Sequence, residues 1–232
     1  MQLYFIGCEH TGKTTLANRI LEWGKENMGG IRHFHDHMTI PCSELSPQAK
    51  DSYSAAHPQV KEMLQRYMVL YHISPEMYDE HPDTNHMGLA IEEAVYAPMY
   101  YGYGGKDSGS PIRSPEGQRT EMARYMEQII LQRAPQTVLV LLKASPQMIR
   151  ERMEKESQTK ANGPQCRVVR TEDIEYVLQR FEEEFEWSLL KNKMILDTTS
   201  STIEESFAEF LQKHEPFMSD ADKKRMKTSR SS

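Results

Sequence analysis

The sequence predicts an α/β fold with a mostly parallel sheet of about five strands and helices on both faces. Three observations lead to this prediction. Short apolar runs alternate with longer amphipathic segments along most of the chain, as expected where strands alternate with crossover helices. The first apolar run ends in a glycine loop that is followed by a helix-like segment. The longest unbroken apolar run covers residues 138–142, which suits a buried strand and is far too short to cross a bilayer.

Five short apolar runs are predicted to be strands, because they are compact and turn-forming residues lie beside several of them. These runs are 3–6, 31–40, 87–91, 137–142 and 194–196. The intervals between them are long enough for the helical crossovers that parallel strands require. No internal repeat interrupts this order.

Six longer segments are predicted to be helices from apolar spacings of three and four or from a proline in the first turn. They are 14–26, 58–72, 116–133, 146–157, 172–190 and a segment that begins near Ile203. Residues 100–117 and 158–169 are polar, contain turn residues and are predicted loops. We expect one domain over residues 1–215 and a basic, disordered tail over 216–232, where the periodicity stops.

Composition and charge exclude several classes of protein. With 38% hydrophobic and 27% charged residues, the 232-residue chain lies in the globular range. The net charge of -6 argues against a protein that coats nucleic acid. The three cysteines are scattered and lack CxxC spacing, which predicts neither a disulfide framework nor a zinc site. The first residues lack a basic leader and read as a strand, so we expect a cytoplasmic location.

The glycine loop carries the most specific motif. Its residues, Gly7-Cys8-Glu9-His10-Thr11-Gly12-Lys13-Thr14, match GxxxxGK[ST] at every fixed position. In such a loop the backbone amides and the helix N-terminus surround phosphate oxygens. Lys13 can reach the β- and γ-phosphates, and the Thr14 hydroxyl can coordinate Mg²⁺. A plain glycine turn with a solvated lysine is the other interpretation, but the preceding strand and the following helix favour the phosphate-binding loop, or P-loop.

These features predict a P-loop NTPase fold that uses ATP and Mg²⁺. The expected nucleotide contacts are Gly7, Glu9, His10, Thr11, Gly12, Lys13, Thr14 and Thr15. A regulatory GTPase would need an NKxD segment, but Asn192-Lys193 is followed by Met194-Ile195. A small-molecule kinase needs a P-loop, an acid that supports the metal, a group near the acceptor and mobile arginines over the phosphates. The chain has a candidate for each part.

Beyond the P-loop, three segments resemble the deoxynucleoside kinase and thymidylate kinase branch of P-loop kinases. Residues 89–96, Leu-Ala-Ile-Glu-Glu-Ala-Val-Tyr, look like the strand of this branch that ends in Glu-Arg-Ser or Asp-Arg before Val-Tyr. Residues 141–152 are similar to the strand, Ser/Thr-Pro and helix entry that lead to its arginine-bearing lid. Residues 172–190 resemble the long helix after that lid, and the order of segments covers residues 1–212.

The resemblance implies roles for several side chains. Glu92, expected at the end of a buried strand, would hold Mg²⁺ together with Thr14; the alternative is an acid that stabilises a helix N-terminus. Asp36, near the end of the second strand, is the candidate base for an acceptor hydroxyl. Glu93 stands where the family usually has arginine. Since its carboxylate would repel a phosphate, we expect the acceptor to present a hydroxyl.

The lid is predicted at residues 158–170, with catalytic arginines at Arg152, Arg167 and Arg170. Arginine suits this role because its guanidinium makes paired, charge-assisted hydrogen bonds to phosphate. Arg150 is a further candidate, but it lies two positions from Arg152, so at most one of the two can face the site.

Two other clusters have open interpretations. His33, His35 and His37 fall on one face of a strand, a spacing that can bind metal but that is also typical of a polar surface. Four tyrosines at 96, 100, 101 and 103 either line a pocket for a flat ring or pack beneath the loop that follows them.

Together the residues and the resemblance predict an ATP- and Mg²⁺-dependent phosphotransferase with Lys13, Asp36, Glu92 and the lid arginines as catalytic residues. The acceptor is expected to be a nucleoside or a nucleotide-like small molecule. The alternatives are a nucleotide-dependent switch that signals to a protein partner and a P-loop kinase of an unrelated hydroxyl metabolite. As partners we expect the small-molecule acceptor and allow for a homodimer, with no membrane or nucleic acid.

Overall fold

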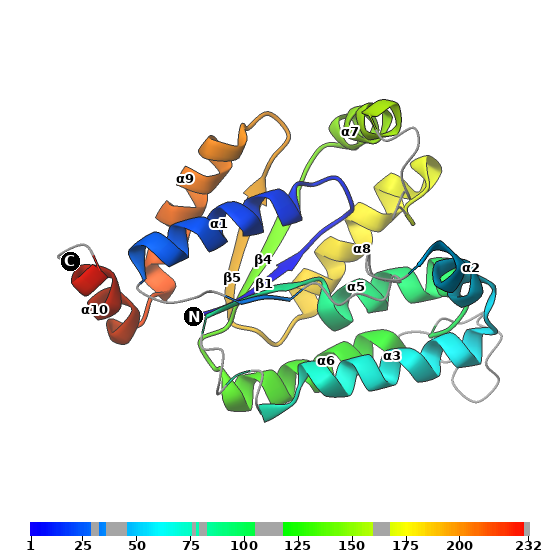
Figure 1. Ribbon diagram of the computed structural model, residues 1–232, viewed down its shortest axis with the longest axis horizontal. Helices are drawn as coiled ribbons and strands as arrows, with labels where there is room; N and C mark the ends of the chain where they lie inside the picture. The colour runs from blue at the N-terminus through cyan, green and yellow to red at the C-terminus, as the bar shows by residue number, and fades with distance from the viewer. Residues whose placement is uncertain are drawn as a thin grey trace.

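The computed structural model describes residues 1–28, 33–35, 46–75, 78, 83–104, 118–159 and 168–229. These residues form a five-stranded sheet in the order β2-β3-β1-β4-β5; Figure 1 labels β1, β4 and β5 of this sheet. The strands are β1 (Gln2–Ile6), β2 (His33–His35), β3 (Thr84–Met87), β4 (Val138–Lys143) and β5 (Asn192–Asp197). All four neighbouring pairs are parallel. The predicted fold class and sheet are confirmed.

Two hydrophobic cores lie on opposite faces of the sheet because successive strand residues point to opposite sides. Leu3 and Phe5 of β1 belong to a core that includes residues of α1 (Lys13–Asn27) and α9 (Ile203–His214). Tyr4 and Ile6 belong to the other core, with residues of α5 (Leu89–Tyr96), α6 (Gln118–Arg133) and α8 (Ile174–Trp187). Helices therefore cover both faces of the sheet (Figure 1).

The remaining elements complete these layers. They are α2 (Pro47–Ala55), α3 (Pro58–His72), the π-helical turn η1 (Ala97–Tyr101), α7 (Pro146–Thr159), the 3-10 turns η2 (Thr171–Asp173) and η3 (Glu215–Phe217), and α10 (Asp220–Ser229). Helix α2 was not expected, although its start has a clear local cause. The Ser46 side chain accepts a hydrogen bond of 3.2 Å from the Ala49 amide, and Pro47 follows the cap.

The third strand differs from the prediction. We expected it at residues 87–91, but β3 is Thr84–Met87, and α5 begins after Gly88. Polar residues can occupy this buried strand because their side chains have partners. Asn85 Nδ2 donates to the Ala17 carbonyl at 2.9 Å, and His86 Nε2 lies 2.8 Å from Gln2 Oε1. Glu92 is therefore in the first turn of a helix and does not end a strand, which corrects its expected position.

The end of the chain also differs from the disordered tail that we expected from residue 216. Helix α10 occupies Asp220–Ser229. Arg225 Nη2 donates to Asp83 Oδ1 at 3.0 Å, and Arg225 also contacts Asp222. Asp83, which directly precedes β3, is 5% exposed. Charged residues of the predicted tail thus attach α10 to the residue that precedes β3. Among the described residues, no helix is long and apolar enough to cross a membrane.

Candidate active site

The P-loop connects the central strand β1 to α1. Gly7 and Gly12 have φ angles of 139° and 90°, a region that favours glycine. A Cβ at Gly7 would lie 2.3 Å from the Leu142 carbonyl oxygen, whereas a Cβ at Gly12 would meet nothing within 4 Å. The base of the loop is therefore packed tightly against β4. The space beside Gly12, at the start of α1, is open to a ligand.

Lys13 folds back over this loop. Its Nζ donates to the Gly7 carbonyl and, at 3.2 Å, to the Cys8 carbonyl. The same atom lies 2.9 Å from Glu92 Oε1 and 5.8 Å from the centre of the Phe181 ring. The Lys13 side chain is only 11% exposed. A cation thus lies at the centre of the P-loop, where it can exchange backbone carbonyls for phosphate oxygens.

Glu92 reaches Lys13 because Gly88 leaves room for it. Gly88 has a φ of 65°, and a Cβ there would lie 2.2 Å from the Glu92 carboxyl carbon. The Gly88 amide donates to the Phe5 carbonyl at 2.8 Å, which fixes the turn against β1. Although Glu92 lies in a helix, the structure brings its carboxylate to the P-loop.

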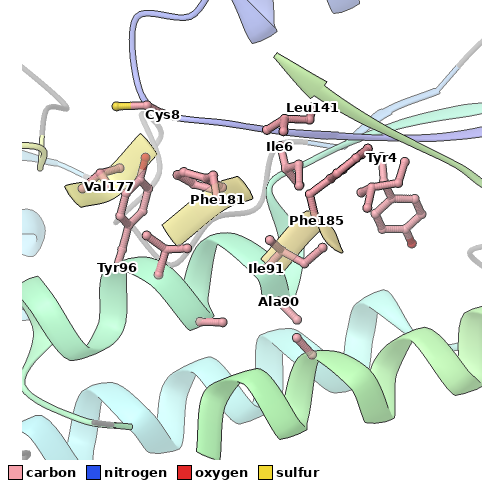
Figure 2. Close-up of a cluster of buried hydrophobic side chains, with 14 of the residues drawn as sticks. Tyr4, Ile6, Cys8, Ala90, Ile91, Tyr96, Leu141, Val177, Phe181 and Phe185 are labelled. Atoms are coloured by element: carbon pink, nitrogen blue, oxygen red, sulfur yellow. The ribbon is translucent and has the colours of Figure 1, made fainter. Parts of the chain in front are cut away.

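Cys8 lies at the base of the loop and is fully buried. Burial raises the pKa of its thiol to about 12, so the thiol is neutral and acts as a small apolar side chain. Figure 2 shows Cys8 in one buried cluster with Tyr96 of α5 and Phe181 of α8. The P-loop therefore lies on a hydrophobic support.

Thr14 and Thr15 are exposed in the first turn of α1. A threonine hydroxyl and the Glu92 carboxylate are oxygen donors of the kind that Mg²⁺ prefers, and Mg²⁺ usually keeps several water ligands. The residues present therefore fit the metal. No group of three or more His, Cys, Asp or Glu side chains that could hold a metal occurs among the described residues. The predicted cluster of histidines at 33, 35 and 37 lies outside the side chains that the structure describes.

Thr11 differs from the two threonines that follow the lysine. Its side chain is buried, and its hydroxyl donates to the Cys8 carbonyl at 2.8 Å. Its carbonyl accepts a hydrogen bond of 2.8 Å from the Thr198 hydroxyl. Thr11 thus stabilises the shape of the loop, and any contact with phosphate would come from its backbone.

Arg152 holds the outer side of the P-loop. Its Nη1 donates to the His10 carbonyl at 2.9 Å, and its Nη2 donates to the Thr198 carbonyl at 2.6 Å. His10 has a φ of 63°, so the loop turns sharply where the guanidinium binds. Burial lowers the pKa of Arg152. This arginine joins the P-loop to the segment after β5.

Glu9 joins the loop to the chain after the predicted lid. Its carboxylate accepts hydrogen bonds from the Val168 amide at 3.1 Å and the Val169 amide at 3.0 Å. Burial raises the pKa of Glu9. On the other side, His10 Nε2 lies 3.6 Å from Glu156 in α7. Glu9 and His10, both predicted nucleotide contacts, therefore hold neighbouring elements through their side chains.

Arg170 and Arg150 are not brought to the P-loop. Arg170 is 61% exposed, binds Asp173 at 2.8 Å and lies 5.6 Å from the Tyr100 ring. Arg150 pairs with Glu175. Arg167 and most of the lid, together with the candidate base Asp36, lie outside the described residues.

Glu93 forms a second buried pair next to Glu92. Arg119 Nη1 lies 3.2 Å from Glu93 Oε1, and the Tyr103 hydroxyl donates to the same oxygen at 3.1 Å. Burial raises the pKa of Glu93, and Arg119 lowers it. Arg119 and Tyr103 thus give the Glu93 carboxyl group partners inside the protein, and the preference for a hydroxyl acceptor stays a prediction. Tyr96 and Tyr103 are buried, which supports the packing interpretation of the tyrosines.

The contacts of Thr198 and Phe181 with the P-loop region and the pairing of Arg119 with Glu93 were not predicted from the sequence. The sequence does contain a feature that points to Thr198 as a site residue. It follows β5, within the hydroxyl-rich stretch of residues 198–202. Ligands of open α/β sheets gather at the carboxyl ends of strands.

Comparisons with known proteins bear on the fold. No protein-family model and no curated protein matches the sequence. Among solved structures, the chain is similar to YorR protein from Bacillus subtilis in complex with phosphorylated GDP, with a TM-score of 0.54 and 16% identity over 94% of this chain and 99% of that one. It is also similar to deoxyadenosine kinase from M. mycoides with bound dATP, with a TM-score of 0.57 and 13% identity over 92% of this chain and 98% of that one. The chain has the fold of P-loop kinases.

The P-loop kinase fold explains why distant residues meet. The P-loop follows the central strand β1, and β3 and β4 flank that strand. Glu92 comes just after β3, and Thr198 comes just after β5. All these residues therefore lie beyond the carboxyl ends of parallel strands, on the same edge of the sheet.

Proposed function

We propose that the protein is an ATP- and Mg²⁺-dependent phosphotransferase that acts on a nucleoside or a nucleotide-like small molecule. The observation that carries the proposal is the contact between Lys13 and Glu92 at the P-loop. A phosphate-binding cation and a carboxylate suited to a metal lie side by side at the start of α1. The bound dATP of one structural neighbour, a deoxyadenosine kinase, supports a nucleotide ligand.

In this mechanism the P-loop amides and the N-terminus of α1 hold the phosphates of ATP. Lys13 leaves the Gly7 and Cys8 carbonyls and neutralises charge that develops during transfer. Thr14 and Glu92 would hold Mg²⁺, which supplies positive charge to the phosphates when bound. Arg152 keeps the loop in shape. Asp36 is our proposed base for the acceptor hydroxyl, and Arg167 and Arg170 are our proposed phosphate contacts from the lid.

Release of ADP, measured against a panel of nucleosides, nucleoside monophosphates and common hydroxyl metabolites, tests the proposal. We expect slow ATP hydrolysis alone and fast ADP release with one class of acceptor. Omission of Mg²⁺ should abolish the fast release. A response to hydroxyl metabolites alone would indicate the kinase of an unrelated metabolite. A lack of response to every acceptor, with stimulation by a protein partner, would favour the switch and contradict the proposal.

A further inference from the structure

Arg119 is a buried arginine with unused hydrogen-bonding capacity. Arg119 as a whole residue is 2% exposed. Its Nη1 donates to Glu93 at 3.2 Å. Its Nε and Nη2 are also buried, and neither has a hydrogen-bond partner among the residues that the structure describes. Buried N–H groups that lack partners are costly, particularly on a charged side chain, so this arrangement calls for a ligand.

The two unpaired nitrogens share one edge of the guanidinium. The N–H bonds of Nε and Nη2 point in parallel from that edge, which can therefore bind two neighbouring acceptor atoms at once. Gly104 fits closely beside the arginine, since a Cβ there would lie 2.1 Å from Arg119 Cγ. Gly104 therefore packs against the aliphatic part of the Arg119 side chain, and Glu93 binds one end of its guanidinium.

Arg119 and Lys13 bind neighbouring residues of α5. Glu93, which binds Arg119, directly follows Glu92, which contacts Lys13. The Tyr103 ring lies beside the pair, and Tyr101 lies next to Tyr103. Tyr103 lies 6.0 Å from the Arg119 guanidinium and stacks on Tyr101 at 6.4 Å. Flat rings beside a guanidinium edge suit a flat ligand.

The charges around Arg119 favour a neutral ligand over a phosphate. The Arg119–Glu93 pair has no net charge. Glu62 lies near enough to Glu93 to act on it electrostatically, and it adds another carboxyl group to this region. A doubly charged phosphate would place more negative charge in a desolvated region that already holds these carboxylates.

We propose that the Nε and Nη2 edge of Arg119 is a specificity-determining contact for the acceptor, and that it binds a neutral flat ring with two adjacent hydrogen-bond acceptor atoms, as on the edge of a nucleobase. This assignment rests on the proposed function, because it takes the region next to Glu92 as the acceptor site.

Binding without ATP tests the assignment separately from turnover. The dissociation constants of free nucleosides, nucleoside 5′-monophosphates and inorganic phosphate are measured by thermal shift on the full chain. We expect at least one nucleoside to bind, and Arg119→Lys to weaken it about tenfold or more, since a bidentate contact to a base contributes roughly that discrimination. A deaza analogue that lacks one of the two acceptor atoms should bind the wild type about tenfold more weakly, and should bind Arg119→Lys no worse than its parent nucleoside.

Arg124→Lys is the matched control. Arg124 lies on the same helix, pairs with Glu127 at 2.8 Å and is outside the site. The Arg124→Lys variant should bind nucleosides with the same affinity as the wild type. If Arg119→Lys does not fold, the double variant Glu93→Gln/Arg119→Gln removes both charges together. It should show the same loss of nucleoside affinity.

Three results would overturn the assignment. One is equal nucleoside affinity in wild type and Arg119→Lys. Another is an absence of nucleoside binding by the wild type. The third is binding of inorganic phosphate or monophosphates alone, lost in Arg119→Lys, which would make this an anion site. These three results concern binding alone. The proposed function is tested separately, by ADP release that depends on an acceptor and on Lys13.

Discussion

Lys13 Nζ lies 2.9 Å from Glu92 Oε1, and the two side chains are 11% and 5% exposed. The P-loop lysine thus belongs to a largely buried ion pair. The lysine therefore contributes to the stability of the empty protein as well as to its proposed chemistry.

Lys13→Ala should lower both activity and stability. Loss of a charge aimed at the transferred phosphate should reduce ADP release about 10²-fold or more. Loss of one partner of a buried pair leaves the Glu92 carboxylate uncompensated, which typically costs about 3 kcal/mol of unfolding free energy. Urea unfolding without nucleotide measures the second effect.

Lys13→Ala/Glu92→Gln separates the two effects. We expect most of the lost stability to return, because the buried charge is gone, while ADP release stays low. If the single variant unfolds at the wild-type urea concentration, the ion pair does not stabilise the protein. Near-normal ADP release in either variant would contradict the role of Lys13 in transfer.

Gly88→Ala should destabilise the protein more than Gly102→Ala. Both glycines have positive φ angles, 65° and 74°, so both variants carry a similar backbone strain of roughly 1 kcal/mol. At Gly88 the new Cβ would also lie 2.2 Å from the Glu92 side chain, whereas at Gly102 its nearest atom is Pro58 Cγ at 3.1 Å. The difference between the losses of unfolding free energy in the two variants measures the cost of moving the Glu92 side chain away from the new Cβ. Equal losses would mean that Glu92 moves away without cost.

The local part of the fold could be predicted from the sequence. Helix α3 has the bounds predicted for it, and α1 differs by one residue at each end, because apolar spacing and proline at a first turn are local signals. Strand β3 was misplaced because its residues Thr84, Asn85 and His86 are polar yet fully buried. Partners far away in the chain, such as Ala17 for Asn85, satisfy them, and no local pattern shows those partners.

The same distinction holds for the candidate site. The P-loop is a contiguous motif, so its position and backbone geometry could be predicted. Contacts between segments that are distant in the sequence could not be predicted. Arg152 reaches the carbonyl of His10 across 142 positions of sequence, and Thr198 reaches Thr11 across 187. Such pairs follow from the order of strands in the sheet, which brings the ends of β1, β4 and β5 together.

Thr198→Val should weaken ATP binding. The Thr198 hydroxyl donates to the Thr11 carbonyl at 2.8 Å and accepts from Arg152 Nη1 at 3.1 Å. Valine keeps the shape and removes both contacts, which should cost about 1 kcal/mol of unfolding free energy and let the P-loop move. We expect the KM for ATP to rise about fivefold or more, an effect of about 1 kcal/mol.

Ser201→Ala is the control for Thr198→Val, since the Ser201 hydroxyl donates to the Asp197 carbonyl in the same segment and makes no contact with the P-loop. Its KM for ATP should stay near the wild-type value. A similar KM for ATP in both variants would show that the contact between Thr198 and the P-loop does not matter for nucleotide binding.

Glu9→Gln should change how stability depends on pH. Burial raises the pKa of Glu9 above its ordinary value of 4.5, so the folded state binds this proton more tightly than the unfolded state does. The stabilising contribution is fully present below pH 4.5 and is lost as the pH rises through the folded-state pKa. Each unit by which the pKa is raised corresponds to about 1.4 kcal/mol. Glutamine has no such proton, so the variant should gain stability relative to wild type as the pH rises.

Urea unfolding of wild type and Glu9→Gln from pH 4 to 7.5 measures this change. A constant offset from altered hydrogen bonds to the Val168 and Val169 amides does not affect the trend with pH. Glu205→Gln is a control of opposite sign, because hydrogen bonds from Thr202 lower the pKa of Glu205. Its stabilising contribution is present above pH 4.5 and is lost only as the pH falls through the lowered pKa. The difference between wild type and Glu205→Gln should therefore stay constant from pH 5.5 to 7.5. If the difference between wild type and Glu9→Gln is equally constant from pH 4 to 7.5, the Glu9 carboxylate is not desolvated in the folded protein, and its contact with residues 168 and 169 is open to water.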